Sequence, residues 1–115
     1  MKRVLLADST AFVRTRLKSS LENKNHSLIE ASTVTETLTE CQRAQPEVMV
    51  IDINLEDTNK IGFIQELKKI DPDALLIIIA KSIDKEMVKQ LMELGIKDIF
   101  VKPFRLDTLI NRINK

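Results

Sequence analysis

Three charged residues, two acidic and one basic, each follow an apolar run in the sequence. Asp8 follows the run Val4–Ala7, and Asp52 follows Val48–Ile51. Lys102 follows a shorter third run near the C-terminus. Continuous apolar runs are typical of parallel strands that are covered on both faces, and sites in such sheets form just beyond the carboxyl ends of the strands. We therefore expect the three side chains to meet at one sheet edge.

Two carboxylates and a lysine at one edge would suit phosphoryl chemistry. Neighbouring carboxylates repel each other unless a cation lies between them, and Mg²⁺ commonly binds one or two carboxylates together with water or phosphate oxygens. A carboxylate can also act as a nucleophile and form an aspartyl phosphate, while a lysine is a compact cation that suits a phosphate oxygen. The alternative interpretation is an acid pair joined to Lys102 by a structural salt bridge.

Strands and helices are predicted to alternate along the chain. The apolar runs predict strands at five segments: Arg3–Ala7, Leu28–Ala31, Val48–Ile53, Leu75–Ile79 and Lys97–Val101. A segment with helical spacing of apolar residues follows each strand. Thr33 or Thr35 and Asp84 are expected to cap two of these helices, and Gly95 to follow the end of one. Strict alternation of this kind predicts a parallel sheet with helices on both faces.

The predicted fold class is therefore α/β, a flavodoxin-like (βα)5 doubly wound parallel sheet with strand order 2-1-3-4-5. One domain is expected to span residues 1–115. This order puts the first and third strands side by side, so that Asp8 and Asp52 would be neighbours with Lys102 across from them. Ser9 or Thr10 can cap the helix that follows the first strand.

The composition argues against several classes of protein. The net charge of +1 creates no strong field for nucleic acid or membrane, and four Phe with no Trp or Tyr offer few platforms for base stacking. The longest apolar run, Ala74–Ala80, is too short to span a membrane. Cys41 is the only cysteine, so neither an internal disulfide nor a thiolate metal cluster can form. A reducing cytoplasm fits this composition.

Three segments carry a resemblance to a known family. They are Leu5–Arg14, Val48–Leu55 and the stretch from Gly95 to Phe104 with its Lys-Pro-Phe triplet. Together they resemble the receiver domain of two-component response regulators, similar to the stand-alone chemotaxis type, over essentially the whole chain. In such domains the peptide bond between Lys102 and Pro103 is often cis.

The resemblance implies a role for each matching residue. Asp52 would be the phosphoacceptor, and Lys102 would pair with the phosphoryl group. Asp8 would hold Mg²⁺, directly or through water, together with Asp52 and the backbone carbonyl of Asn54. Ser9 stands where the family usually has a second acid, so it would be at most a weak ligand and Mg²⁺ binding would be weakened.

Several positions depart from the family pattern. Ala80 stands where the family has a switch Ser or Thr, and Ile99 replaces an aromatic residue. Because strand side chains repeat every two residues, Ser82 could substitute for the missing hydroxyl after a modest shift. Gly62 lies ten residues after Asp52 instead of eight, which indicates a longer loop over the site.

Two functions are compatible with these observations. In the first, the chain is a signalling protein and not an enzyme: Asp52 accepts a phosphoryl group from a histidine kinase or phosphotransfer protein, with the help of Mg²⁺. A downstream protein would then bind the surface formed by the fourth helix, fifth strand and fifth helix, through which a dimer could also form. In the second, the domain is a degenerate receiver that docks partners regardless of phosphorylation.

An enzyme on a similar fold is disfavoured. A haloacid-dehalogenase-type phosphatase uses an Asp-x-Asp pair after its first strand, whereas here Asn54 takes the second place and the motif lies on the third strand. A flavodoxin would need a phosphate-binding loop after the first strand, and neither of the two glycines lies there. Arg14 is expected to be a surface residue of the first helix.

Overall fold

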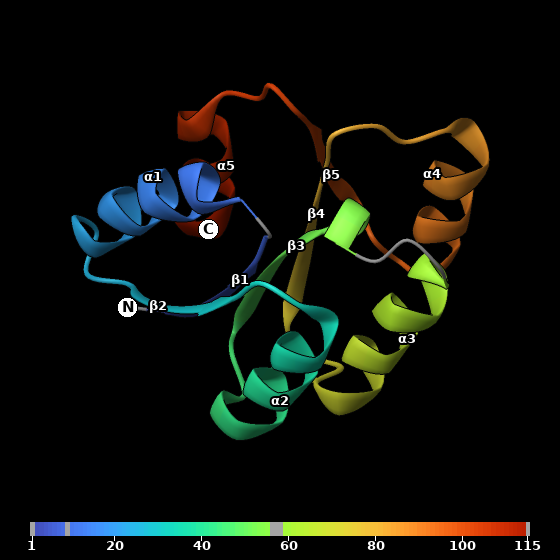
Figure 1. Cartoon of the computed structure of the whole chain (residues 1–115), viewed down its shortest axis with the longest axis horizontal. Helices are drawn as coiled ribbons and strands as arrows, with labels where there is room; N and C mark the ends of the chain where they lie inside the picture. The colour runs from blue at the N-terminus through green and yellow to red at the C-terminus, as the bar shows by residue number, and fades with distance from the viewer. Residues whose placement is uncertain (1, 9, 56–58, 115) are drawn as a thin grey trace.

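Strands and helices alternate along the chain as predicted (Figure 1). The computed structural model describes residues 2–8, 10–55 and 59–114, with only the backbone for residues 11–13. The strands are Arg3–Ala7 (β1), Ser27–Ala31 (β2), Val48–Asp52 (β3), Leu75–Ala80 (β4) and Asp98–Val101 (β5). The helices are Ala11–Glu22 (α1), Val34–Ala44 (α2), Lys60–Ile70 (α3), Lys85–Glu93 (α4) and Leu106–Asn114 (α5), with a 3-10 turn at Ile53–Leu55 (η1).

All strand pairs are parallel, and the sheet order β2-β1-β3-β4-β5 confirms the predicted doubly wound topology. Ala7 pairs with Ile51, so the residues after them, Asp8 and Asp52, lie level at the carboxyl edge. Ala80 pairs with Val101, which brings the residue after β5 to the same edge. The register therefore decides which side chains meet there.

Helices cover both faces of the sheet. Figure 1 shows α1 and α5 on one side, and α2, α3 and α4 on the other. Alternate residues of each strand enter two separate cores, because successive strand side chains point to opposite faces. In β1, Val4 and Leu6 pack with α1 and α5, whereas Leu5 and Ala7 pack with the other three helices. All four are fully buried, which explains why the strand sequences are apolar without alternation.

The predicted helix ends are largely confirmed. Thr33 and Asp84 cap α2 and α4 by accepting backbone N–H groups three residues on, and Gly95 follows α4 with φ +87°. β3 ends at Asp52, one residue earlier than predicted, because Ile53 begins the 3-10 turn. β4 continues to Ala80, one residue further than predicted.

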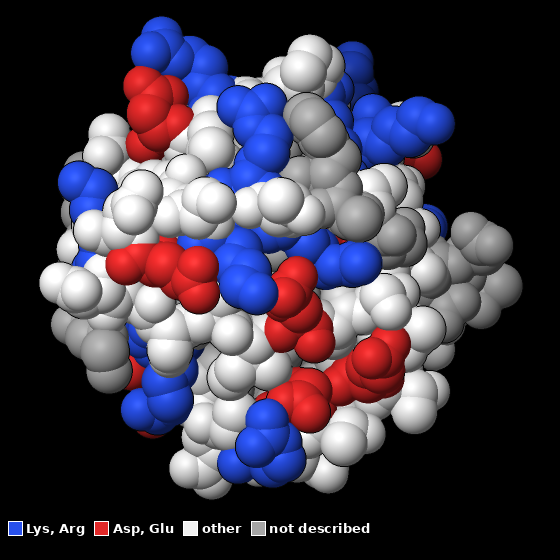
Figure 2. Space-filling model, turned by 60° about the vertical axis from the view of Figure 1, so that its left-hand side comes forward, with Lys and Arg blue, Asp and Glu red and all other residues white. Residues whose placement is uncertain are grey.

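The distribution of surface charge and the character of the helices bear on what surrounds the domain. Figure 2 shows basic and acidic side chains interspersed over the face that it presents, in keeping with the net charge of +1. In the described part of the chain, no helix has the length and apolar character needed to cross a membrane.

The start of α3 explains the position of Gly62. Asn59 adopts a left-handed conformation with φ +48°, and its side chain accepts a hydrogen bond from the backbone N–H of Gly62 at 3.2 Å. A Cβ atom on Gly62 would collide with the Asn59 side chain. Gly62 is therefore needed to leave room for the helix cap, and not for a left-handed turn.

We predict that Gly62→Ala destabilises the domain by about 1 kcal/mol, because the added methyl group displaces the cap. In an Asn59→Gly background, which has no cap side chain, the same substitution should stabilise α3 by up to about 1 kcal/mol, since alanine is the better helix former. Urea unfolding of the two pairs measures both effects. The same sign of change in both backgrounds would show that Gly62 does not serve the cap.

Candidate functional site

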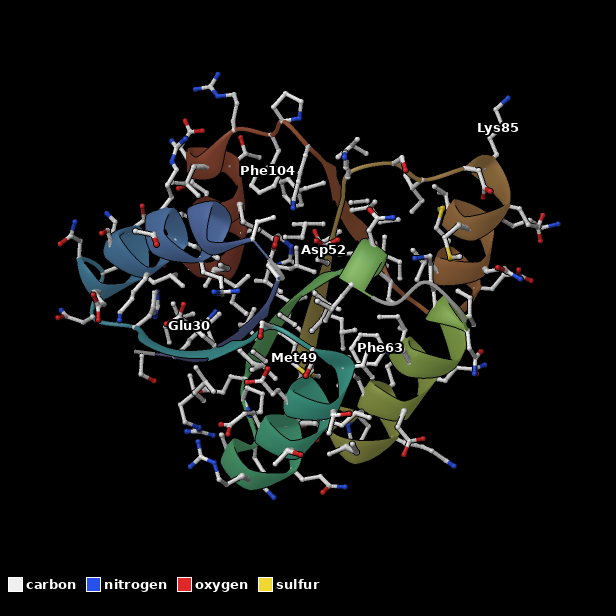
Figure 3. The ribbon with its side chains drawn as sticks, in the orientation of Figure 1. Glu30, Met49, Asp52, Phe63, Lys85 and Phe104 are labelled. Atoms are coloured by element: carbon white, nitrogen blue, oxygen red, sulfur yellow. The ribbon has the colours of Figure 1, made fainter. Side chains whose placement is uncertain are left out.

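Asp8, Asp52 and Lys102 meet at the carboxyl edge of the sheet, as the sequence predicted. Lys102 Nζ lies 3.0 Å from Asp8 Oδ2 and 3.4 Å from Asp52 Oδ2. The two acidic side chains are almost fully buried, with exposed fractions of 0% for Asp8 and 6% for Asp52. Figure 3 shows Asp52 at the end of β3, beside the 3-10 turn. A single ammonium group thus lies between two buried anions.

Asp8 is held by more contacts than the sequence indicated. Its Oδ1 accepts hydrogen bonds from both the backbone N–H and the hydroxyl of Thr10, each at 2.7 Å. Thr10 occupies the N-cap position of α1, but its side chain makes no cap bond. The expected cap position of Thr10 is therefore confirmed, but its hydroxyl donates to Asp8 instead of serving α1. Ser9, the other expected cap and the weak metal ligand, lies outside the described residues.

Arg14 is also tied to this edge. Its Nη1 donates to the backbone carbonyl of Asp8 at 2.6 Å, and its Nε lies 3.5 Å from Glu30 Oε1 on β2. Only 23% of the side chain is exposed. Arg14 is thus a partly exposed residue of α1, as expected, and it also reaches back to the strand end, a contact that the sequence did not indicate.

Asp52 presents its two oxygens to different partners. Oδ1 accepts the backbone N–H of Asn54 at 2.9 Å, and Oδ2 faces Lys102. The first bond turns the chain out of β3 into the 3-10 turn. Every described side-chain polar atom that is buried has a hydrogen-bond partner, so the cluster is held without an unsatisfied group.

Burial and charge act in opposite directions on Lys102. Burial alone lowers the pKa of its ammonium group, but the hydrogen bond to Asp8 and the charges of Asp52 and Asp8 outweigh it. The pKa of Lys102 is therefore raised above its ordinary value. The backbone N–H of Lys102 donates to the Ala80 carbonyl at 2.7 Å, and the following peptide bond to Pro103 is cis, as the resemblance implied.

The site is open to solvent at Lys102, whose side chain is 21% exposed. Lys102 also lines part of a groove of about 520 Å³. The groove is lined by Thr10, Arg16, Lys81, Lys102, Pro103, Phe104 and Leu106. Both interpretations of the sequence, salt bridge and phosphoryl site, require the contact of Lys102 with the acids. Access to that contact is the additional feature that a reactive site needs.

The oxygen donors at this edge fit a hard divalent cation. Asp8 and Asp52 supply two carboxylates, and Asn54 follows on the 3-10 turn with its backbone carbonyl. Mg²⁺ usually takes only one or two protein carboxylates and fills the remaining positions with water or phosphate. No group of three or more His, Cys, Asp or Glu gathers among the described residues. Two carboxylates and a backbone carbonyl are hard oxygen ligands, which suit Mg²⁺ better than Zn²⁺.

The side chain of Asn54 has a contact that sequence reasoning missed. Its Oδ1 accepts the backbone N–H of Lys81 at 2.7 Å, and its Nδ2 donates to the carbonyl of Ser82 at 3.3 Å. Because β4 ends at Ala80, Ser82 lies in the following loop with an exposed side chain. The expectation that Ser82 replaces the missing hydroxyl of position 80 rests on the two-residue repeat of strand side chains, but Ser82 does not lie in the strand.

Ala80 and Ile99, the two other positions that depart from the family pattern, have apolar side chains that pack in or against the core. The Ala80 methyl group is fully buried, and Ile99 packs against the core on the side of α2, α3 and α4. Neither side chain can form a hydrogen bond with a group bound at Asp52.

Sequence comparison places these residues in a family context. The model of the response regulator receiver domain matches residues 4–114. The chemotaxis protein CheY of Thermotoga maritima is 32% identical over 115 residues, which cover 99% of this chain and 96% of that protein. The CheY protein of Bacillus subtilis is 29% identical over 114 residues, with coverage of 98% and 95%.

Solved structures agree on the fold. A CheY-like receiver domain protein from Methanospirillum hungatei superimposes with a TM-score of 0.91 at 21% identity, covering 99% of this chain and 91% of that one. A response regulator from Burkholderia pseudomallei, solved with a phosphorylated aspartic acid, a calcium ion and citrate, gives 0.85 at 19% identity. The match covers 96% of this chain and 65% of that one.

We expect Lys102→Met to lower the free energy of unfolding by about 3 kcal/mol in chelator, because two buried carboxylates lose their counter-charge. Millimolar Mg²⁺ should restore more stability in this variant than in the parent, since a divalent cation can replace the ammonium group. Urea unfolding at neutral pH with EDTA or Mg²⁺ measures both effects. Lys97→Met, an exposed lysine at the opposite end of β5, is the matched control. Equal Mg²⁺ effects in all three proteins would contradict this account.

The raised pKa of Lys102 also predicts a loss of stability in alkaline solution. The stabilisation is fully present below the pKa of an unfolded lysine, about 10.4, and is lost as the pH rises through the higher folded value. The difference in unfolding free energy between the parent and Lys102→Met should therefore be constant near neutral pH and shrink in alkali. A difference that persists unchanged into strong alkali would show that the charge of Lys102 is not responsible.

Proposed function

The chain belongs to the response regulator receiver domain family of two-component signalling, and we propose that it accepts a phosphoryl group on Asp52. The observation that carries the proposal is the position of Lys102 between the buried Asp8 and Asp52, next to an accessible groove. The phosphorylated aspartate of the Burkholderia regulator supports the same chemistry in a related fold.

Asp52 Oδ2 is the nucleophilic oxygen in this proposal. Oδ1 is already engaged with the Asn54 N–H, whereas Oδ2 faces the ammonium group at the longer distance of 3.4 Å. Oδ2 forms the bond to phosphorus while the bond to the donor's leaving group breaks, and the leaving group departs with the electron pair. Lys102 then neutralises charge on the phosphoryl oxygens, as a positioned cation does in phosphoryl transfer.

Asp8, Asp52 and the carbonyl of Asn54 would hold Mg²⁺. The ion, when bound, neutralises negative charge on the phosphoryl group and its acceptor. The hydrogen bonds from Thr10 keep Asp8 Oδ1 fixed, so Asp8 needs no rearrangement of its backbone to serve as a ligand. Ser9 in place of an acid predicts that Mg²⁺ binds weakly.

The proposed partners are a histidine kinase or phosphotransfer protein as donor and a downstream protein that binds α4, β5 and α5. Two observations support this surface. Met92 on α4 is 63% exposed and Val101 on β5 is 48% exposed, and they are the exposed large hydrophobic residues of the described chain. The same surface could form a dimer. The cytoplasmic location and the absence of an enzymatic activity of its own remain predictions from the sequence and the family.

A second candidate function, phosphorylation-independent docking, is favoured by the buried methyl group of Ala80 and by Ile99. Neither can carry a hydrogen bond from a phosphoryl group to the surface. In this version the cluster of Asp8, Asp52 and Lys102 is purely structural, and partners bind the unmodified domain.

Incubation with acetyl phosphate and Mg²⁺, followed by intact mass measurement, separates the two functions. We expect a phosphoryl mass gain on the parent and none on Asp52→Ala. Lys102→Ala should gain mass more slowly, because the transferred group loses its counter-charge. A parent that gains no mass even at high Mg²⁺ would refute phosphoacceptance and leave the docking function.

A further inference from the structure

Asn54 lies just after β3, the strand that ends at Asp52, and its side chain is hydrogen-bonded to the loop between β4 and α4. Its side-chain amide bonds that loop in both directions: Oδ1 accepts the N–H groups of Lys81 and Ser82 at 2.7 and 3.4 Å, and Nδ2 donates to the Ser82 carbonyl at 3.3 Å. The side-chain amide thus pairs with the loop as a backbone peptide group would, and it does so with residues 27 and 28 positions away in the sequence. The first two residues of the loop are therefore held in place by hydrogen bonds to Asn54 on the 3-10 turn.

The same residue is bonded to the acceptor. The backbone N–H of Asn54 donates to Asp52 Oδ1 at 2.9 Å. Beyond Ser82, the loop leads to Asp84, whose Oδ1 caps α4 by accepting the N–H of Met87 at 2.8 Å. Hydrogen bonds thus link Asp52 to Asn54 and Asn54 to Lys81 and Ser82, and the chain continues from Ser82 to the cap of α4 at Asp84.

A hollow lies beside Asn54 and the β4–α4 loop. It has a volume of about 380 Å³ and lies between the 3-10 turn and the starts of α3 and α4. It is lined by Ile53, Asn54, Lys60, Ser82, Ile83, Asp84 and Met87. The buried methyl group of Ala80 cannot provide a hydrogen bond between the site and this loop, whereas the amide of Asn54 already does.

We propose that Asn54 is the positioning residue that couples the state of Asp52 to the β4–α4 loop. This rests on the proposed phosphorylation of Asp52. With a phosphoryl group on Oδ2, Oδ1 changes from a carboxylate oxygen to the neutral carbonyl oxygen of an acyl phosphate. Hydrogen bonds to charged acceptors are about twice as strong as neutral ones, so the bond that fixes the Asn54 backbone weakens. The side chain then releases the loop, and the start of α4 changes position.

The tie itself can be tested without phosphorylation, by hydrogen exchange at the backbone amides of the unmodified domain. Asn54→Ala should speed exchange of the Lys81 amide by about three- to tenfold, the effect of one lost hydrogen bond, and leave the Ile78 amide in β4 unchanged. Asn54→Asp keeps the acceptor oxygen and should retain most of the protection. Asn111→Ala, the same change at an exposed position on α5, should have no effect. Equal Lys81 exchange in the parent and in Asn54→Ala would overturn the proposal.

The coupling is tested by adding Mg²⁺ and beryllofluoride, a phosphoryl analogue, and following amide chemical shifts. In the parent, shifts should reach Lys81, Ser82 and the first turn of α4. In Asn54→Ala at saturating analogue, the shifts in the loop and in α4 should fall by at least half relative to the shifts at Asp52 and Lys102. Unreduced loop shifts in a variant that binds the analogue would refute the coupling. Absence of shifts at Asp52 in the parent would instead refute the proposed function, and the coupling with it, while the exchange experiment would still report on the tie.

Discussion

The structure depends on one electrostatic constraint: two carboxylates buried at the same sheet edge must share a cation. Asp8 and Asp52 have almost no contact with water, and two buried charges of the same sign without a cation between them would destabilise the fold. Lys102 supplies the compensating charge from the end of a third strand. The parallel order β1-β3-β4-β5 brings these three strand ends together. The ion pairs of Lys102 with the two acids therefore depend on the strand order.

Asp8 and Asp52 each form the same hydrogen-bonded turn with the residues that follow them. In each case Oδ1 accepts the backbone N–H two residues on, from Thr10 at 2.7 Å and from Asn54 at 2.9 Å. Such turns mimic a backbone turn and lead the chain away from the strand. One carboxylate oxygen is thereby fixed to the backbone, and Oδ2 is left to face Lys102. The geometry explains how an acid at a strand end can present a single oxygen to Lys102.

Much of this arrangement was predictable from the sequence because it depends on strong local signals. The apolar runs that end in Asp8, Asp52 and Lys102 predict strands, and strict alternation leaves few topologies. The shifts of one residue at the ends of β3 and β4 were not predictable, since they depend on the hydrogen bond of Asn54 to Asp52 and on pairing with β5. The contacts of Arg14 and of the Asn54 side chain are long-range or depend on side-chain rotamers, which periodicity does not encode. The only sequence signal for these contacts was the presence of polar residues within a few positions of a strand end. Such residues are common in loops, so they do not identify a particular contact.

A crystal structure of the domain with Mg²⁺ and beryllofluoride would show which oxygen accepts a phosphoryl group. We expect beryllium bonded to Asp52 Oδ2, a fluoride in contact with Lys102 Nζ, and the Asn54 N–H still nearest to Oδ1. Beryllium on Oδ1, on Asp8 or on neither residue, with the salt bridges of Lys102 unchanged, would contradict the claim that this buried, cation-bridged pair of acids is built to accept a phosphoryl group.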